Sequence, residues 1–563
     1  MAHVIAAPCV ADYSCVEVCP VNCIGPSPND TRLDGVEQLY IDPSRCIDCS
    51  ACVDACPVSA IYKDTDIPEK WQHYRDLNRE YFLFNPAALE RALGDGVSSV
   101  SRDSVDRPLR VAIVGSGPAG MYAVGSLLEE SGLNVEIDLY DRLPTPGGLV
   151  RAGVAPDHLQ KKLITDRLFS HYLRWPQVRF IGNVEVGRHI YHADLSDWYD
   201  SVVYAVGATN DKRIGIPGEE LVGSWSAHEF VSWYNGHPDF AHLKFDFSCE
   251  RAIVVGNGNV SLDVARMLTM PLSCLEKTDI ADYALEALQD RNIREVVILG
   301  RRGLAEASFS NAELEELGSI EGVEIVVDHG CQDESLVPMD SQLSWVTRRK
   351  FETLAYLSSR REEKAKKRIV FQFRASPLEI QGSTKVEQIL LARNALKSDA
   401  EGKTNIFDTK ERIRLDAGLV LLAIGYGGVP LQGLPFNYND ATIDNILGRV
   451  VSSGVVACGA YVVGWIKRGP RGVIGSNKQC ARETVQNLCK DFIEGLLEPA
   501  SLSREQVLAA VRQRQPKLIL EQGWRRIDRF ERHIGRRQGR PRVKVTDVDS
   551  MIEISKKGEP GSC

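Results

Sequence analysis

Eight of the 15 cysteines lie in the first 56 residues, in two groups whose spacing suits iron–sulfur clusters. The first group reads Cys9-x5-Cys15-x3-Cys19-Pro20-x2-Cys23, and the second reads Cys46-x2-Cys49-x2-Cys52-x3-Cys56-Pro57. In the run C-x2-C-x2-C-x3-C-P, three closely spaced thiolates hold one cluster and the fourth ligates another. Zinc sites usually contain two separated C-x2-C pairs instead. The N-terminal cysteines therefore predict iron–sulfur clusters.

A glycine-rich segment, Gly115-x-Gly117-x-x-Gly120, follows a strand predicted over 111–114 and precedes a helix. The first glycine permits a tight turn, the second lets the backbone approach a pyrophosphate, and the third lets the helix pack on the strand. The next predicted strand, 135–140, ends at Asp141, whose carboxylate can bind ribose hydroxyls and would repel a 2′-phosphate. This site predicts FAD or NAD rather than NADP.

A second segment, Gly256-x-Gly258-x-x-Ser261, follows a strand predicted over 253–255. Serine is small enough to replace the third glycine. A strand predicted over 295–299 precedes Arg301 and Arg302, and two arginines at that end of a strand suit a 2′-phosphate. A helical insert over 275–289 explains the long spacing. This site predicts NADP.

The elements that must position these loops form an α/β fold with two Rossmann-like dinucleotide domains. Apolar runs over 202–208 and 419–426 bracket the second motif. In flavoproteins with two dinucleotide folds, such strands mark the crossings between domains, so we predict that the NADP domain is inserted in the FAD domain. The predicted order is a small α+β iron–sulfur head (1–62), a linker (63–107), the first segment of the FAD domain (108–210), the NADP domain (211–429), and the second segment of the FAD domain with the C-terminal region (430–563). The linker is expected to be helical in part over 69–93 and to end in a polar flexible stretch.

Composition narrows the class of protein. The chain has 563 residues, 44% of them hydrophobic, and a net charge of −9, which disfavours nucleic-acid binding. It has no run of about 20 apolar residues and no visible secretory signal, so we expect a cytoplasmic protein without a membrane span. We also expect a monomer. After residue 56 there is no C-x-x-C pair, which excludes a disulfide-reductase dithiol there.

Residues 1–62 resemble a two-cluster bacterial ferredoxin. The resemblance implies a first cluster site held by Cys9, Cys15 and Cys56, and a second cluster site that holds [4Fe–4S] through Cys19, Cys46, Cys49 and Cys52. Asp12 stands where a further cysteine would follow Cys9, as in seven-iron ferredoxins, which hold [3Fe–4S] there. We therefore expect [3Fe–4S] at the first site, with [4Fe–4S] open if an Asp12 oxygen completes it. Cys23 matches an extra, non-ligand cysteine of those ferredoxins.

The remaining chain resembles adrenodoxin-reductase-type ferredoxin–NADP reductases, and the whole resembles their fused form. The matching segments include GSGPAGMY (115–122), GLVRAGVAPDH (148–158), GNGNVSLDVAR (256–266), GRRG (300–303) and GWIKRGPRGVIG (464–475). The resemblance implies FAD contacts at Ala119, Asp141, Leu149, Val186, Trp465, Gly472, Val473 and Ile474. It implies NADP contacts at Asn257, Gly258, Asn259, Val260, Arg301, Arg302, Glu313 and Gly472. His158 and Asp263 match polar residues near the flavin, with a tuning or proton-relay role.

The activity implied is hydride transfer between NADPH and FAD, followed by one-electron transfer to the clusters and to an external ferredoxin or other one-electron acceptor. One alternative is an electron-input subunit of a larger enzyme, such as the small subunit of glutamate synthase. The blocks GWIKRGP and APDH disfavour it. Another alternative, a non-catalytic redox sensor, is disfavoured by the intact nucleotide motifs.

Charge raises a question about carrier docking. Residues 1–65 hold nine acidic and three basic residues, and acidic carriers commonly dock on basic patches. In separate reductases of the family, basic residues of the NADP domain dock the carrier, and Arg348, Arg349 and Lys350 stand in about the right region. Their role is open because this chain supplies its own ferredoxin. The arginines between Arg504 and Arg542 are expected on a solvated helical surface.

Overall fold

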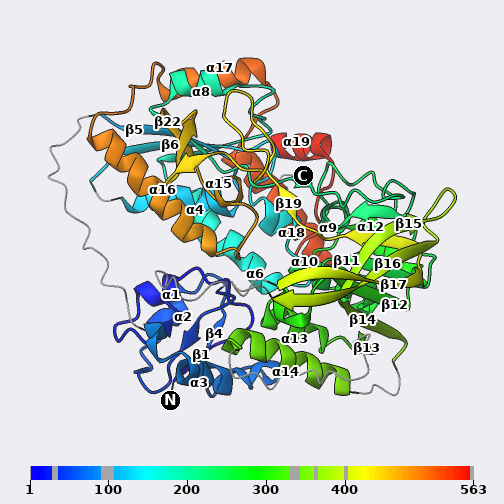
Figure 1. Cartoon of the computed structure of the whole chain (residues 1–563). Coiled ribbons are helices and arrows are strands. Elements are labelled where there is room, and N and C mark those ends of the chain that lie inside the picture. The colour runs from blue at the N-terminus through cyan, green and yellow to red at the C-terminus, as the bar shows by residue number, and fades with distance from the viewer. Residues whose placement is uncertain are drawn as a thin grey trace.

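The computed structural model describes residues 2–27, 36–89, 107–130, 132–328, 343–360, 365–398 and 404–557. It contains two large sheets, each covered on both faces, and a small N-terminal head (Figure 1). The predicted α/β class is confirmed. Among the helices of the described residues, none combines the length and apolar character needed to span a bilayer.

The first sheet has eight strands in the order β20-β21-β22-β8-β5-β6-β7-β23, and its five central strands are parallel. Successive residues of β5 are buried on opposite faces, so that Val111 and Ile113 lie in one core and Ala112 and Val114 in another. Both faces are covered, which is why apolar side chains occupy both faces of β5 over 111–114. The strands are β5 (Leu109–Val114), β6 (Val135–Tyr140), β7 (Val178–Gly182), β8 (Ser201–Tyr204), β20 (Asn445–Ile446), β21 (Arg449–Ser452), β22 (Val455–Val462) and β23 (Ile519–Leu520).

Helices complete the two cores around this sheet. The core that holds Val111 continues into the paired helices α4 and α16, and the core that holds Ala112 continues into α8 and α17. The helices are α4 (Pro118–Glu129), α5 (Leu149–Ala152), α6 (Leu159–Ile164), α7 (Ser170–Tyr172), α8 (His192–Trp198), α15 (Trp465–Arg468), α16 (Ser476–Ile493), α17 (Arg504–Arg514), α18 (Glu521–Arg537) and α19 (Val548–Lys556).

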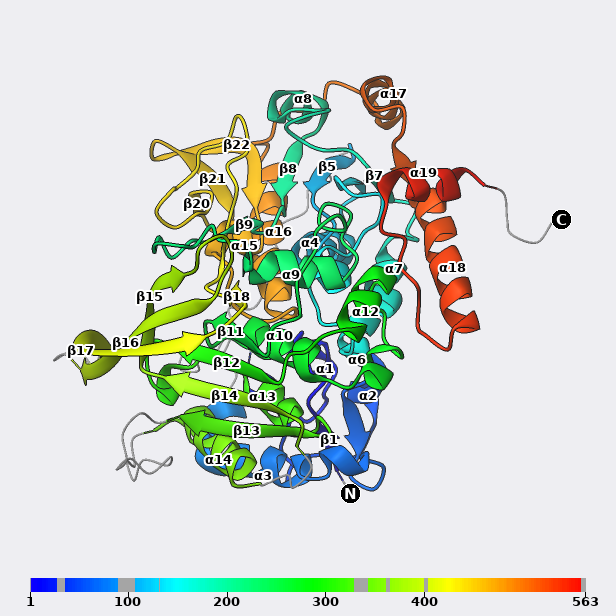
Figure 2. The same ribbon diagram turned by 90° about the vertical axis from the view of Figure 1, so that its right-hand side faces the viewer.

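The second sheet is fully parallel, in the order β10-β18-β11-β12-β14-β13 (Figure 2). Helices cover one face, and the antiparallel strands β15 to β17 cover the other. The strands are β10 (Ser224–Ser226), β11 (Arg251–Val255), β12 (Glu295–Gly300), β13 (Val323–Asp328), β14 (Lys367–Phe373), β15 (Ala375–Gln381), β16 (Gln388–Ser398), β17 (Thr404–Asp416) and β18 (Leu419–Leu422). The helices are α9 (Ala227–Tyr234), α10 (Asn259–Thr269), α11 (Leu272–Leu275), α12 (Asp282–Gln289), α13 (Asn311–Leu317) and α14 (Trp345–Ser359).

The second sheet is inserted in the first. The chain leaves the first sheet after β8, forms β10 to β18, and returns as β20 to β22, where β22 pairs directly with β8. A two-stranded ladder of β9 (Asn210–Asp211) and β19 (Tyr426–Gly427) lies at this double crossing. The arrangement is the one expected for an NADP domain inserted between 211 and 429, although the boundary residues stay a prediction.

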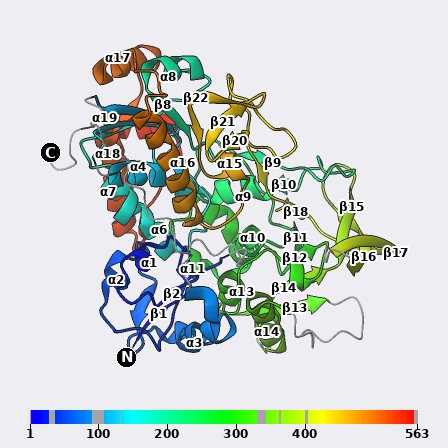
Figure 3. The same ribbon diagram turned by 60° about the vertical axis from the view of Figure 1, so that its left-hand side comes forward.

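The head pairs β1 (His3–Ile5) with β4 (Ile61–Lys63), and β2 (Ile24–Gly25) with β3 (Tyr40–Ile41). Two short helices, α1 (Ser14–Glu17) and α2 (Ala51–Ala55), carry cysteines beside these ladders. The head lies in the angle between the two large sheets, below α4 and α16 and beside α13 and α14 (Figures 1 and 3).

Within the segment predicted as a linker (63–107), part of the stretch expected to be helical (69–93) forms a helix that packs on the head. Helix α3 (Tyr74–Phe84) buries a face at helical spacing against the head. Its Asn78 is buried, and the amide oxygen accepts the N–H groups of Ile5 (3.1 Å) and Ile41 (2.8 Å). These bonds satisfy strand-edge groups of the head, so this segment belongs to it. Residues 90–106 lie outside the described residues.

The expected solvated surface between Arg504 and Arg542 is wrong for several arginines. Arg504 donates to Asp138 (3.2 Å), and Arg542 pairs with the fully buried Glu531 (3.0 Å). The buried Arg540 donates to the carbonyl of Thr278 (2.9 Å). Asp138 and Thr278 lie in other regions of the chain, so the local pattern carries no sign of these contacts.

Candidate functional site

The first glycine-rich loop lies at the carboxyl edge of β5, where α4 begins. Gly115 has a φ of +106°, and a Cβ there would lie 2.5 Å from the carbonyl oxygen of Ala205. A Cβ on Gly120 would lie 1.9 Å from the carbonyl oxygen of Gly115. At Gly117 the nearest atom would be 3.8 Å away, so the backbone is open on that side. The loop therefore has the tight turn, close packing and open approach that a pyrophosphate needs.

Asp141 follows β6 at the same edge. Its Oδ2 accepts the N–H of Ser116 (3.0 Å), and its Oδ1 accepts the N–H of Leu143 (2.9 Å). Burial raises the pKa of Asp141, while the bonds from Ser116 oppose that rise. The carboxylate is thus fixed beside the loop, in a position that fits an adenosine ribose of FAD.

Two further predicted FAD contacts lie near this loop. A Cβ on Gly148 would lie 2.8 Å from the Cα of Gly117, which places the following Leu149 beside the loop. The N–H of Val184 donates to the backbone carbonyl of Asp141 (2.9 Å), which brings the segment that contains Val186 to the same edge.

The segment 464–475 closes over the loop from the other side. A Cβ on Gly464 would lie 2.5 Å from the Cβ of Ala119, so the start of this segment touches α4. Trp465 stacks on Tyr426, with ring centroids 6.1 Å apart. The Nε of Arg468 is buried without a partner in the described part of the chain and is available to a polar ligand.

The three residues expected at the flavin lie at the end of this segment, directly before α16. Gly472 has a φ of +84°, the carbonyl of Val473 accepts the hydroxyl of Ser476 (2.7 Å), and the carbonyl of Ile474 accepts the amide of Asn477 (2.9 Å). These bonds fix the backbone of the segment, and the residues present fit a flavin.

The second loop lies between β11 and α10. Gly256 has a φ of +127°, and a Cβ on Gly258 would meet nothing within 4 Å. The carbonyl of Asn257 accepts the N–H of Ser308 (3.0 Å), and the side chain of Asn259 accepts the N–H of Ser310 (2.7 Å). Residues 308–310 are therefore tied to the loop beside Val260 and lead into α13, which carries Glu313.

Arg301 and Arg302 follow β12 at the edge that carries this loop. The carbonyl of Arg301 accepts the amide of Asn394 (2.8 Å), which fixes the backbone. Within the described residues neither guanidinium has an acidic partner, and the Nε of Arg302 is buried with no hydrogen bond. An unpaired guanidinium at this edge fits a 2′-phosphate, and so the residues fit NADP.

His158 lies at the start of α6, in the first domain, and contacts two helices of the second. Its Nε2 lies 2.5 Å from Oε2 of Glu316 and 3.4 Å from Oε2 of Glu313, both on α13. Asp263 on α10 is 3.9 Å from the other ring nitrogen. The predicted residues His158, Asp263 and Glu313 are therefore brought together where the two domains meet.

Arg266 completes this buried cluster. It lies 2.8 Å from Asp263 and 2.5 Å from Glu316, and Lys161 pairs with Glu313. We call the set the interdomain cluster; its members are Asp157, His158, Lys161, Asp263, Arg266, Glu313 and Glu316. His158, Glu313 and Glu316 could geometrically hold a metal ion, but Lys161 and Arg266 already neutralise the carboxylates.

The interdomain cluster shifts the pKa values of its members. Burial and Arg266 act to lower the pKa of His158, but Glu313 and Glu316 outweigh them and raise it. Burial would raise the pKa of Glu313, but the charges of His158 and Lys161 bring it below its ordinary value. Burial raises the pKa of Asp263 to about 6 against the charge of Arg266. The cluster can hold a proton at His158.

Sequence reasoning missed Arg266, Glu316 and Lys161. Arg266 stands three residues after Asp263 in the quoted segment GNGNVSLDVAR, and Glu316 stands three residues after Glu313. This spacing puts each pair on one helix face, which was an available signal. Their partner His158 lies more than 100 residues away.

The head brings cysteines of the two groups together. The thiols of Cys56 and Cys15 lie near Cys9, and the carboxylate of Asp12 lies near all three. The thiols of Cys46, Cys49 and Cys19 lie near Cys52. Both sets match the predicted ligand sets, whose assignment stays a prediction. The buried Cys23 has its Sγ 3.4 Å from the Sγ of Cys19.

The donor set fits iron–sulfur clusters. Burial and, to a smaller extent, neighbouring thiolates raise the pKa of Cys9 and of Cys52 to about 12. A cationic iron core bound by the thiolates offsets that cost.

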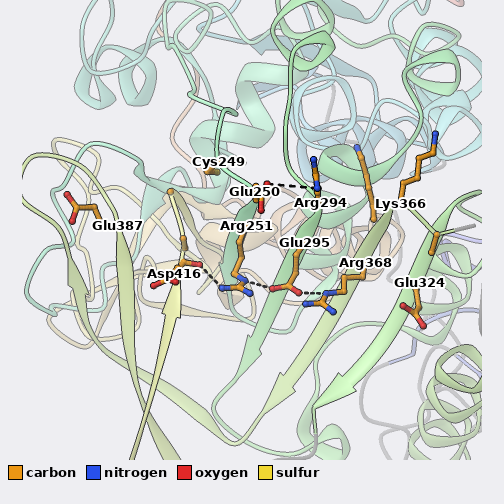
Figure 4. Close-up of a pocket in the computed structure, with 14 residues that line it drawn as sticks. Cys249, Glu250, Arg251, Arg294, Glu295, Glu324, Lys366, Arg368, Glu387 and Asp416 are labelled. Carbon is orange, nitrogen blue, oxygen red and sulfur yellow. Dashed lines mark hydrogen bonds and ion pairs between the residues drawn. The ribbon is translucent and has the colours of Figure 1, made fainter.

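The cavity lined by Cys249, Arg294 and Lys366 lies at the opposite end of the second sheet (Figure 4). Its volume is about 820 Å³, and a row of ion pairs joins Arg251, Glu295 and Arg368 across it. Ligands of parallel sheets bind at the carboxyl ends of the strands, so this amino-end cavity is separate from the nucleotide loops.

Comparisons with known proteins agree with this geometry. Residues 8–60 match the family model "4Fe-4S dicluster domain", and residues 109–327 match "Pyridine nucleotide-disulphide oxidoreductase". The chain is 41% identical to the "Probable ferredoxin/ferredoxin--NADP reductase" of Mycobacterium leprae, covering all of this chain and 99% of the relative. It is 45% identical to the "NADPH-ferredoxin reductase FprA" of Mycobacterium tuberculosis, covering 80% of this chain and 99% of the relative.

A solved structure of the M. tuberculosis FprA in complex with NADPH matches with a TM-score of 0.75, covering 80% of this chain and all of that one. The fold and the two nucleotide loops define an NADPH-dependent flavoprotein oxidoreductase that carries an iron–sulfur domain. Within that class, the chain belongs to the family of ferredoxin/ferredoxin–NADP reductases. The alternative of an electron-input subunit of a larger enzyme is not favoured.

Proposed function

We propose that the chain oxidises NADPH at the second loop, holds FAD at the first loop, and delivers single electrons through its own head to an external ferredoxin or similar acceptor. The observation that carries this proposal is the direct contact between His158, which matches a polar residue near the flavin, and Glu313, a predicted NADP contact. FAD accepts a hydride and releases electrons singly, which is the chemistry needed between NADPH and a cluster.

The chain's own residues supply binding and orientation. Gly115, Gly117 and Gly120 receive the pyrophosphate of FAD, and Arg301 and Arg302 hold the 2′-phosphate of NADPH. Hydride transfer needs positioning more than acid–base groups. The interdomain cluster joins the two domains through His158, whose pKa is raised by Glu313 and Glu316.

Anaerobic stopped-flow absorbance tests the proposal. With NADPH, the flavin band at about 450 nm should bleach first, and the broad iron–sulfur band should follow. NADH should act far more slowly. If NADPH leaves the flavin oxidised, the reductase function is wrong. If the flavin bleaches and the cluster band never follows, the head is not in the path.

We further propose [3Fe–4S] at the first cluster site, because Asp12 stands there in place of a cysteine. Asp12 accepts hydrogen bonds from the N–H (3.3 Å) and hydroxyl (2.7 Å) of Ser14, which occupy both carboxylate oxygens. Iron analysis should give about seven irons per chain rather than about eight. A value of about eight would contradict this proposal. A cytoplasmic, monomeric protein also remains our proposal.

A further inference from the structure

The head contacts the reductase at the residue that directly follows the predicted flavin contacts. The N–H of Gly475 donates to the carbonyl of Val10 (2.9 Å), and a Cβ on Gly475 would lie 2.3 Å from the carbonyl carbon of Ala11. Val10 and Ala11 lie between Cys9 and Cys15 of the first cluster site. The backbone of this site therefore lies against the end of the segment 472–474.

Charged residues on α16 extend this contact. Lys478 is buried and donates to the hydroxyl of Ser14 (3.0 Å) and to Glu17 (3.1 Å). Arg482, one turn further, lies 2.8 Å from Glu17. We call the contact of Val10 to Glu17 with Gly475 to Arg482 the inner interface.

The second cluster site faces away from this interface. Cys49 is exposed, and Ile47 keeps 59% of its surface accessible. Within the part of the chain that the structure describes, residues 42–55 have no hydrogen bond or ion pair to the reductase. We call the surface around Ile47 and Cys49 the outer face.

The head also covers the basic residues of the NADP domain. Lys350 is buried and lies 3.5 Å from Glu37 of the head, and Arg348 lies over the ring of Phe84 (5.3 Å). Trp345, on the same helix, packs edge-on against Tyr40, with centroids 5.5 Å apart. A separate carrier cannot reach this basic surface while the head occupies it.

We propose that the head is a resident carrier with a fixed direction: electrons enter at the first cluster site across the inner interface and leave at the outer face to a basic one-electron redox protein. The proposal rests on the function proposed above and adds its geometry. A basic partner is favoured because the head is acidic and because Asp54 is exposed in the segment 42–55, which carries Ile47 and Cys49. For each NADPH oxidised to NADP⁺, one proton is released and two partner molecules each gain one electron.

Zero-length carbodiimide cross-linking tests the docking without any activity. The reagent joins a lysine amine to a carboxylate that already pairs with it, so digestion should yield a Glu17–Lys478 cross-linked peptide. Lys478→Gln should remove this peptide, whereas Lys490→Gln, an exposed position on the same helix, should not. Cross-links from acids of 42–55 to reductase lysines, in place of this one, would overturn the proposed orientation.

Charge reversal tests the direction, with cytochrome c as the basic one-electron protein probe. Lys478→Glu should slow the NADPH-driven bleaching of the cluster band at least tenfold, and Glu17→Lys in the same chain should restore much of the rate. The matched change Lys490→Glu should leave it unaltered. If Lys478→Glu instead slows only cytochrome c reduction, α16 is where the external partner docks, and the proposal is wrong.

The outer face is tested separately. Ile47→Glu should lower the ratio of the cytochrome c rate to the internal cluster-bleaching rate about tenfold, whereas Ile47→Leu should retain it. Iron content is measured for both variants, so that cluster loss is recognised and the ratio is taken per cluster. An unchanged ratio in Ile47→Glu would contradict the outer face. A wild-type flavin that NADPH fails to bleach would instead contradict the proposed function.

Discussion

The N–H of Gly475 donates a 2.9 Å hydrogen bond to the carbonyl of Val10, and this bond joins the reductase to the head beside the first cluster site. Gly475 has a φ of −69°, which any residue can adopt, so its small size is needed for the contact rather than for the backbone. This hydrogen bond holds the head against the reductase, although a long segment of the chain separates Val10 from Gly475.

The substitution Gly475→Ala tests the contact between Gly475 and the backbone of Ala11. The new Cβ would lie 2.3 Å from backbone atoms of Ala11, which cannot move aside as a side chain could. We expect a loss of about 1–3 kcal/mol at the interface and a lower melting temperature of the cluster absorbance band. Gln479→Ala, in the same turn of α16, is the matched control. Equal melting curves for Gly475→Ala and the wild type would contradict the contact.

Arg302→Ala should weaken selection of NADPH. The loss of a charged hydrogen bond costs about 1.5–3 kcal/mol, which lowers kcat/KM for NADPH by about ten- to a hundredfold and leaves the value for NADH nearly unchanged. Steady-state kinetics with both nucleotides measure this. Arg294→Ala, before the same strand, is the control because Arg294 lies at its other end. A parallel fall for NADH would count against a 2′-phosphate site.

His158→Gln should destabilise the contact between the domains in a pH-dependent way. The pKa of His158 is raised in the folded chain, so the stabilisation is complete below its ordinary value of 6.5 and is lost as the pH rises through the folded pKa. The difference in apparent melting temperature between wild type and variant should be largest at about pH 6 and should shrink toward higher pH. A difference that grows with pH would show that His158 is not held protonated.

Asp279→Asn should loosen the tie between the C-terminal region and both domains. Asp279 is buried and pairs with Lys162 (2.7 Å) and with the buried Lys544 (3.1 Å). Leaving two buried ammonium groups without their carboxylate costs about 3–5 kcal/mol at neutral pH. Thermal unfolding checks the loss. Asp290→Asn, an exposed position nearby in sequence, should have little effect.

The ion pairs of Asp279 with Lys162 and Lys544 should weaken only in strong acid. Burial alone would raise the pKa of Asp279, but Lys162 and Lys544 lower it well below its ordinary value of 3.8. A lowered carboxyl pKa contributes stability above the unfolded value, and that contribution disappears as the pH falls through the folded pKa. The wild type and Asp279→Asn should therefore converge in stability only in strong acid.

Short-range patterns determined much of this protein. The strand over 135–140 is found at the predicted residues, and those over 111–114, 253–255 and 295–299 are found with ends shifted by at most two residues. The glycine loops could be predicted from the sequence because a tight turn and a closely packed helix need glycine at fixed positions, as Gly115 and Gly120 show. The family could be predicted from the sequence because its motifs are long continuous segments.

Tertiary structure decided what pairs across long distances in the chain. His158 reaches Glu316, Lys478 reaches Ser14 and Arg540 reaches the carbonyl of Thr278, and no local periodicity predicts such partners. The segment around Asn78 reads as a polar linker until the strand edges that it satisfies are in place. Buried polar groups must find partners, and which partners they find depends on how the domains pack. The sequence therefore determined most of the elements and the classes of cofactor, FAD, NADP and iron–sulfur, and the packing decided how the head meets the reductase.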